Sequence, residues 1–156
     1  MTTPMAGRTN HPSEVISLRI PSRLEHLALL DRVTQSVCER LEFVEDTSSP
    51  VSMSVIEAGT NAIQHGHHKD PSKMVDFDFH LRPGTLEVEV RDQGKGFDVG
   101  HIAGDVTSPE HLFDARGRGI FIMRSCMDSV EFDFTDGGTR CRLVKTAPRK
   151  AATATA

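Results

Sequence analysis

The chain has 156 residues, with 18 Lys and Arg against 22 Asp and Glu, so its formal net charge is −4 and its length suits one compact domain. This mild acidity removes the electrostatic basis for general nucleic-acid binding, and no apolar run reaches the roughly 20 residues that a membrane-spanning helix needs. The three cysteines are an odd number without CxxC spacing, which argues against disulfides and a zinc site and favours a reducing, cytoplasmic location.

The two ends of the chain differ in composition from the rest. Residues 1–13 and 147–156 are rich in Thr, Pro, Gly or Ala and lack helical or strand periodicity, which predicts disordered tails. Residues 14–146 are therefore expected to form a single domain.

The domain is predicted to begin with a strand and a long helix. Alternating apolar residues indicate a strand over residues 14–20, which Pro21 ends. Ser22 and Glu25 have the spacing of a capping box, and apolar residues then recur at helical spacing to about Val44.

A second helix is predicted after a polar loop over residues 45–49. Ser49 and Pro50 are a typical N-cap and first helical residue, and the helical pattern continues to Gly66. Gly59 inside this helix indicates close packing, because glycine lowers helix stability by about 1 kcal/mol relative to alanine.

The sequence of the second half of the domain predicts four strands and a short helix. Alternation indicates strands over residues 75–81 and 86–90, joined by a Pro-Gly turn. Residues 92–118 are Gly-rich and weakly patterned, and so long a connection predicts a functional loop. A short apolar helix over 120–127 precedes a terminal hairpin over 130–143. This order of elements indicates an α+β two-layer sandwich, with helices on one face of a mixed, mostly antiparallel sheet.

A polar stripe lies on the second predicted helix. Glu57, Asn61 and His65 are four residues apart and share one face. Such a stripe is usually a solvated face, but a carboxylate one turn from a carboxamide can also orient a nucleophile and bind a hard cation such as Mg²⁺. His65, His67 and His68 form a loose cluster, which a polar helix end explains better than a metal site.

A first glycine-containing motif follows the strand over 86–90. Asp92 ends that strand and is followed by Gly94, Gly96 and Phe97. Glycine permits positive φ and close approach of a ligand, and the Asp92 carboxylate could accept a hydrogen bond from an amino group. An ordinary turn is the plain alternative, because an isolated GxG is a weak signal, and the ligand spacing of an EF-hand calcium loop is missing.

A second glycine-containing motif opens the short helix. Free backbone N–H groups and the helix dipole make such a start an anion site, and two arginines add positive charge. A glycine-rich loop leading into a buried helix is an equally simple interpretation, and the context of a Rossmann or Walker A motif is missing. The motif consists of Arg116, Gly117, Arg118, Gly119 and Ile120.

In this order, the three segments resemble the N, G1 and G2 boxes of the GHKL ATPase superfamily, and residues 137–143 resemble its last Gly-Thr strand. The resemblance covers roughly residues 14–145, and the compact length and the motif details are most similar to the anti-sigma-factor serine kinases. It implies the Bergerat ATP-binding fold, with ATP and Mg²⁺ as cofactors.

The resemblance also implies a role for each matching residue. Glu57 would be the general base, Asn61 would ligate Mg²⁺, and Asp92 would accept the adenine amino group with Thr139 nearby. Residues 99–116 would form a lid over ATP. The other ATP-binding residues that the resemblance implies are Gly94, Gly96, Phe97, Arg116, Gly117, Arg118, Gly119 and Ile120.

The implied partners are proteins. The resemblance implies a kinase that phosphorylates a serine of a STAS-type anti-anti-sigma factor and otherwise holds a sigma factor, in regulation of transcription during stress. We expect a homodimer. We do not expect the phospho-acceptor domain of a histidine kinase or the transducer domain of chaperones and gyrases. The alternative is a non-catalytic, nucleotide-dependent module that holds a sigma factor or activates a phosphatase. The presence of Glu57 favours the enzyme, because a pure binder needs no base.

Overall fold

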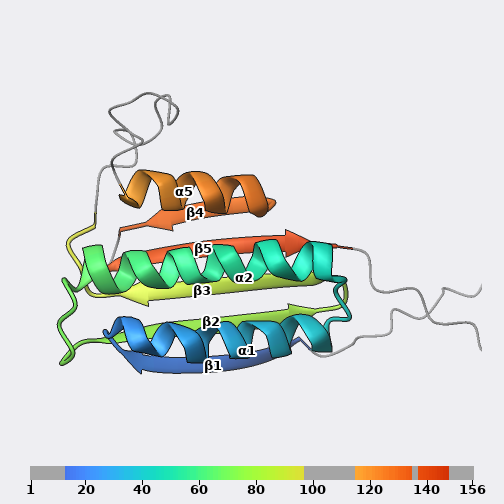
Figure 1. Ribbon diagram of the computed structural model, residues 1–156, viewed down its shortest axis with the longest axis horizontal. Helices are drawn as coiled ribbons and strands as arrows, with labels where there is room; N and C mark the ends of the chain where they lie inside the picture. Colours follow the sequence, from blue (N-terminus) through green and yellow to red (C-terminus); the bar gives the residue numbers. More distant parts are fainter. Residues whose placement is uncertain (1–12, 97–114, 135–136, 148–156) are drawn as a thin grey trace, which may run out of the picture.

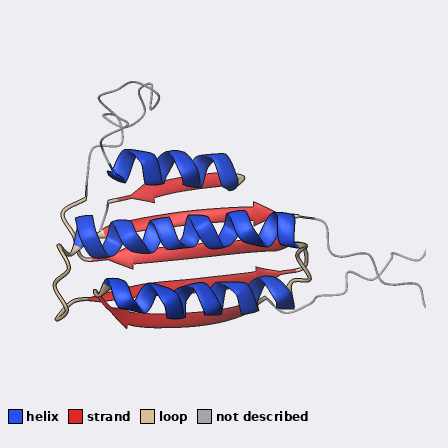
Figure 2. Ribbon diagram, in the orientation of Figure 1, coloured by secondary structure: helices blue, strands red, loops and turns tan. Residues whose placement is uncertain are grey.

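A computed structural model describes residues 13–96, 115–134 and 137–147. A five-stranded sheet in the order β1-β2-β3-β5-β4 is covered on one face by helices (Figures 1 and 2). All four strand pairs are antiparallel, so the predicted α+β sandwich is confirmed. The strands are β1 (Glu14–Pro21), β2 (Met74–Arg82), β3 (Thr85–Asp92), β4 (Ser129–Asp133) and β5 (Thr139–Thr146). The helices are η1 (Leu24–His26), α1 (Leu27–Arg40), α2 (Glu45–Thr60), η2 (Asn61–Gly66) and α5 (Ala115–Cys126).

The core lies between the sheet and the helices. Every second side chain is buried from Val75 to Leu81 on β2 and from Leu86 to Val90 on β3, as the predicted alternation requires. The close packing expected at Gly59 is also present, because a Cβ there would lie 2.9 Å from Cδ2 of Leu30 on α1. The largest side chains of this core that are almost fully buried include Phe77, Phe79, Leu30, Ile63, Leu86, Ile120, Met123 and Leu143.

The predicted start of the first helix is wrong. The capping box does not form, since the Ser22 hydroxyl is buried against His67 and the N-cap position, Arg23, makes no side-chain cap bond. The helix also ends earlier than Val44. Glu42 has a φ of 57°, and the N–H of Phe43 reaches back to the carbonyl of Cys38, which closes α1 in the manner of a Schellman motif.

The predicted loop over 45–49 is helical instead. Acidic residues Glu45 and Asp46 occupy the first turn of α2, where they oppose the positive end of the helix dipole. Pro50 therefore lies inside the helix, where its missing N–H removes one backbone hydrogen bond. The predicted end at Gly66 is correct, although the last six residues form the π-helical segment η2.

The last helix also begins earlier than predicted. It starts at Ala115 rather than at 120, so part of the predicted loop over 92–118 is helical. The terminal hairpin is confirmed by the pairing of β4 with β5. The predicted lid lies outside the described residues except for its last two positions, and the predicted tails lie outside except for Ser13 and Ala147.

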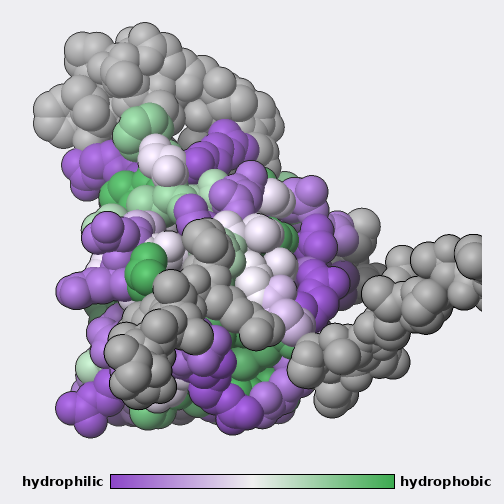
Figure 3. All heavy atoms as spheres, turned by 90° about the vertical axis from the view of Figure 1, so that its right-hand side faces the viewer, coloured by the Kyte–Doolittle hydropathy of each residue, from purple (hydrophilic) through white to green (hydrophobic). Residues whose placement is uncertain are grey.

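The two ends of the sheet differ in the elements that meet there and in their surface. At the left of Figure 1, the end of β3, the end of η2 and the start of α5 lie side by side. Figure 3 shows the opposite end, where hydrophilic residues surround smaller hydrophobic areas in the described part of the surface. Among the described helices, we find none with the length and apolar character that crossing a membrane would require.

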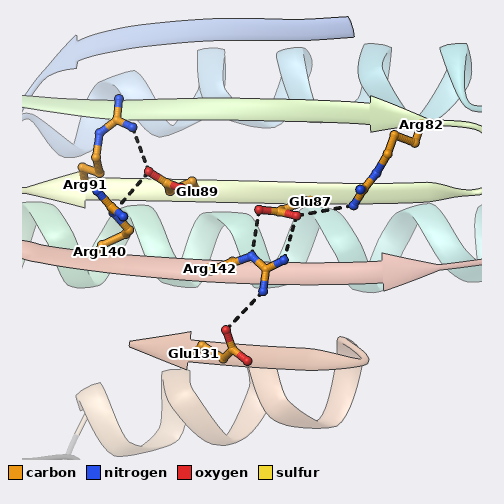
Figure 4. Close-up of polar contacts among 7 residues, drawn as sticks. All are labelled: Arg82, Glu87, Glu89, Arg91, Glu131, Arg140 and Arg142. Carbon is orange, nitrogen blue, oxygen red and sulfur yellow. Dashed lines mark hydrogen bonds and ion pairs between the residues drawn. The ribbon is translucent and has the colours of Figure 1, made fainter. Parts of the chain in front are cut away.

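The face of the sheet that the helices leave open carries a network of ion pairs (Figure 4). Arg142 on β5 donates from Nε and Nη2 to the two carboxylate oxygens of Glu87 on β3, at 2.7 and 3.0 Å. Two arginines approach one carboxylate oxygen of Glu89, with Arg91 at 2.8 Å and Arg140 at 3.3 Å. Acids on this face are thus paired with arginines from their own or adjacent strands.

Candidate functional site

The helical segment that carries Glu57 and Asn61 widens as it reaches the end of the sheet. From Asn61 onward it is π-helical, and the N–H of His67 donates to the carbonyl of Ala62, five residues earlier, at 2.9 Å. Such π segments occur often at functional sites.

Helix α5 brings Gly119 against the two polar residues of α2 and η2. A Cβ added at Gly119 would lie 2.7 Å from Oε2 of Glu57 and 3.6 Å from Oδ1 of Asn61. A side chain here would push the carboxylate aside, so the absence of a Cβ is what permits this approach. Three residues that the sequence predicts for one site therefore meet in space, although Gly119 comes from a different motif than Glu57 and Asn61.

Glu57 is half-buried, and burial changes the acidity of its carboxyl group. Burial raises the pKa of Glu57 above its ordinary value, while the nearby positive charge of Arg118 acts in the opposite direction. A carboxylate with a raised pKa is a stronger base than one in water and can take a proton from a positioned hydroxyl group.

Asp92 lies at the end of β3 with backbone packed closely around its carboxylate. The N–H of Gly94 donates to Oδ1 at 2.7 Å, and a Cβ at Gly66 would lie 2.7 Å from Cγ. Burial raises the pKa of Asp92, and the Gly94 N–H, His67, Arg116 and the backbone of Thr139 oppose this shift. The acid is thus desolvated, with backbone groups as its hydrogen-bond donors among the described residues.

A pocket opens between η2, the end of β3, β5 and the start of α5. Its described lining is largely apolar with a few polar groups, which is typical of a small-molecule site. Nδ2 of Asn61 is buried there and has no hydrogen-bond partner within residues 13–96, 115–134 and 137–147. The described lining residues are Ala58, Asn61, Ala62, Gly66, Val90, Asp92, Gly96, Arg116, Phe132, Thr139 and Cys141.

The predicted site residues divide into several groups. Asn61, Asp92, Gly96, Arg116 and Thr139 line the pocket together, and Thr139 is the β5 partner of Asp92 in the sheet register.

The other predicted residues lie beside the pocket or outside the described chain. Glu57 lies one helical turn from Asn61 and is not among the described lining residues. Gly94 supports Asp92, Ile120 is buried in the core, Gly117 and Arg118 lie in the first turns of α5, and Phe97 lies outside the described residues.

Sequence reasoning missed a buried polar contact beside this pocket. His67 was expected at a polar helix end, but it is only 1% exposed and its Nδ1 lies 2.5 Å from Oγ of Ser22. Each residue lies directly after an element that ends at this edge of the sheet, and that placement is the signal that could have found the pair. Within the described part of the chain, no cluster of three or more His, Cys, Asp or Glu could hold a metal ion.

Comparison with known proteins agrees with this geometry. A family model described as the histidine kinase-like ATPase domain matches residues 20–145. The chain belongs to this family. The predicted resemblance to the GHKL superfamily is thereby confirmed.

Named relatives and a solved structure refine the comparison. The chain is 26% identical over 131 residues to proteins named serine-protein kinase RsbW from Bacillus cereus (strain AH820) and from Bacillus anthracis, with 81% of each chain covered. It also superposes on a crystal structure of the RsbU and RsbW domains of Rv1364c from Mycobacterium tuberculosis, with a TM-score of 0.63 and 14% identity over 91% of this chain. The chain covers 35% of that larger protein, and the likeness shows the shared fold.

Proposed function

We propose that this protein is an ATP-dependent serine-protein kinase that phosphorylates a STAS-type anti-anti-sigma factor and sequesters a sigma factor, so that it regulates transcription. The observation that carries the proposal is the half-buried carboxylate of Glu57 beside Gly119 and Asn61. A module that only held a nucleotide would have no need of a base there. The relatives named serine-protein kinase support serine as the phosphate acceptor.

The residues of the pocket fit ATP and Mg²⁺. Asn61 offers its Oδ1 to a hard cation, and its buried Nδ2, which has no partner in the described chain, is available to a bound ligand. Mg²⁺ commonly takes one or two protein ligands and completes its shell with phosphates and water, so a single amide is sufficient. Asp92 offers its second carboxylate oxygen to the amino group of adenine, because the N–H of Gly94 occupies Oδ1.

The chemistry assigned to the chain's own residues is positioning and proton transfer. Bound ATP with Mg²⁺ supplies the phosphoryl group and neutralises its charge. Glu57 accepts the proton of the substrate serine hydroxyl while that oxygen forms its bond to the γ-phosphorus and the bond to the ADP oxygen breaks. The first turn of α5 provides backbone N–H groups and Arg116 and Arg118 for the phosphates.

The proposal includes a homodimer. Leu24 and Leu29, at the start of the first helical segment, are 36% and 47% exposed and give apolar area for contact with a second copy or a partner. Sedimentation velocity of the purified protein tests this part, and a single monomeric species at micromolar concentration would contradict it.

A transfer assay tests the proposed kinase directly. The purified protein is incubated with γ-labelled ATP, Mg²⁺ and the candidate STAS-type partner, with a partner whose acceptor serine is replaced by alanine as the control. We expect label on the wild-type partner alone. Binding of ATP without any transfer would instead favour the non-catalytic switch, and absence of ATP binding would overturn both.

A further inference from the structure

We propose that His67 is a positioning residue for the nucleotide site, which holds the backbone around Asp92 through one ring nitrogen and makes adenine binding sensitive to acid. The inference rests on the proposed function, because it assumes that Asp92 contacts adenine. It concerns a side chain that lies outside the three motifs that identify the family.

The imidazole of His67 connects three parts of the chain. The residue follows η2 directly, and its ring is buried. Nδ1 lies 2.5 Å from Oγ of Ser22, which follows β1, and Nε2 lies 2.8 Å from the backbone N of Gln93, which follows β3. The ring therefore joins the ends of η2, β1 and β3 at the edge where the pocket opens.

The hydrogen bonds determine which ring nitrogen carries the proton. A backbone N–H can only donate, so Nε2 must be the acceptor for Gln93 and must lack a proton. The proton of the neutral ring is then on Nδ1, which donates to Oγ of Ser22. A second proton on the ring would set an N–H against the Gln93 N–H and break this bond.

The bond to Gln93 bears directly on Asp92. Gln93 lies between Asp92 and Gly94, whose N–H donates to the Asp92 carboxylate. Gly66, the residue before His67, also packs on that carboxylate, and a Cβ at Gly94 would lie 2.7 Å from Cα of Gly66. Moving His67 would therefore displace the acid from both sides.

Burial favours the neutral form of His67 at neutral pH. Burial lowers the pKa of His67 and Lys73 acts in the same direction, whereas Asp92, Asp70 and the side chain of Gln93 oppose them. The contact is complete above this lowered pKa and is lost as the pH falls through it. Acidification below the ordinary range of histidine is thus expected to loosen the Asp92 loop.

Two substitutions at the same position separate the roles of the ring nitrogens. His67→Asn retains a polar group near the position of Nδ1 but has no acceptor that reaches Gln93. His67→Gln places Oε1 near the position of Nε2, and it does not titrate. We expect His67→Asn to weaken ATP binding by about 3- to 10-fold near neutral pH, as loss of one hydrogen bond implies, and His67→Gln to recover most of that loss.

The pH profile of binding gives a readout that a purely structural role would not change. Between about pH 7.5 and about pH 5, wild-type affinity for ATP is expected to fall more steeply than that of His67→Gln. Titration of the nucleotide phosphates is common to both proteins, so the difference between the profiles belongs to His67, acting directly and through its charge on the pKa of Asp92. His80→Asn, on the open face of the sheet, is the matched control and should behave as wild type.

Calorimetry with ATP and Mg²⁺, together with histidine side-chain ¹⁵N–¹H spectra of the apo protein, tests this role of His67. A deprotonated Nε2 in the spectra, weaker binding by His67→Asn and recovery by His67→Gln would support the proposal. Equal affinities for the two variants, identical pH profiles, or a proton on Nε2 would overturn it.

A second variant keeps the test decisive if His67→Asn does not fold. Ser22→Ala removes the acceptor for Nδ1–H, favours the other tautomer and should weaken ATP binding in the same direction, whereas unchanged binding would contradict the proposal. Failure of the wild-type protein to bind ATP at any pH would instead refute the proposed function, and the spectra would still report on the contact between His67 and Gln93.

Discussion

Acidic side chains occur in two contrasting settings in this protein, one on the open face of the sheet and one around the pocket. On the open face, hydrogen bonds from Arg142 lower the pKa of Glu87, and Arg82 lies 3.5 Å from the same carboxylate (Figure 4). Around the pocket, burial raises the pKa of both Glu57 and Asp92. The pKa values of the acids in these two settings are thus shifted in opposite directions within one small domain.

This difference separates a structural role from a functional one. An acid that is paired with arginine contributes a modest amount to stability and has little capacity left for a ligand. A desolvated acid with fewer charged partners slightly destabilises the folded protein. A ligand that donates a hydrogen bond to that acid offsets this cost when it binds. The contrast predicts that substitutions at the pocket change function strongly and that those on the open face change only stability.

The largest effect is expected for Glu57→Gln. It removes the proposed base and retains the size of the side chain, so phosphate transfer should fall by about 10²- to 10⁴-fold while ATP affinity changes only a few-fold. Initial transfer rates and calorimetry measure the two quantities separately. The wild-type rate should also fall on acidification, as the pH passes down through the raised pKa of Glu57. A parallel loss of binding and transfer would contradict the role of a base.

Asp92→Asn is expected to weaken ATP binding by about 10- to 100-fold. The single amide oxygen would remain with the Gly94 N–H, so the amide NH₂ would face the amino group of adenine, donor against donor. Unfolding in urea should show equal or greater stability, because the variant lacks the buried charge. A clear loss of stability together with unchanged ATP binding would show that Asp92 belongs with the structural acids.

A smaller effect is expected for Gly66→Ala. Its methyl group would lie 2.7 Å from Cγ of Asp92 and would displace the carboxylate. We expect ATP binding to weaken by about 10-fold, in line with the cost of overpacking. Gln64→Ala in the same π turn is the control and should bind ATP as the wild type does, as measured by calorimetry. Equal effects of the two substitutions would point to η2 as a whole instead of to the contact with Asp92.

The smallest effect is expected for Glu87→Gln. It should lower the free energy of unfolding by no more than about 1 kcal/mol, because Arg142 is 40% exposed and solvent screens the pair. The contribution of Glu87 is present above the ordinary pKa of a glutamate and is lost as the pH falls through its lowered folded value. Urea unfolding near pH 7 and near pH 3 measures this, and a change in ATP affinity would contradict the division between the two faces.

Most of the secondary structure could be predicted because its signals are local. Alternation along β2 and β3 and the Gly-Gly turn of the last hairpin depend on neighbouring residues, so the sequence alone indicates them. The errors occurred at helix ends. The positive φ of Glu42 closes α1 at a residue type that rarely adopts it, and Ser22 makes a distant contact in place of a helix cap.

The motifs around Glu57, Asn61, Asp92 and Gly119, with their order and spacing, were sufficient to predict the family and the fold. The tertiary structure decided that Gly119 touches Glu57, that Gly66 encloses Asp92, and that a buried His67 joins the ends of three elements. The physical reason is the distance along the chain over which each effect acts. Periodicity and turn chemistry act over a few residues, whereas the partner of a buried polar group, and therefore its pKa, depends on which distant segments the packing of the core brings together.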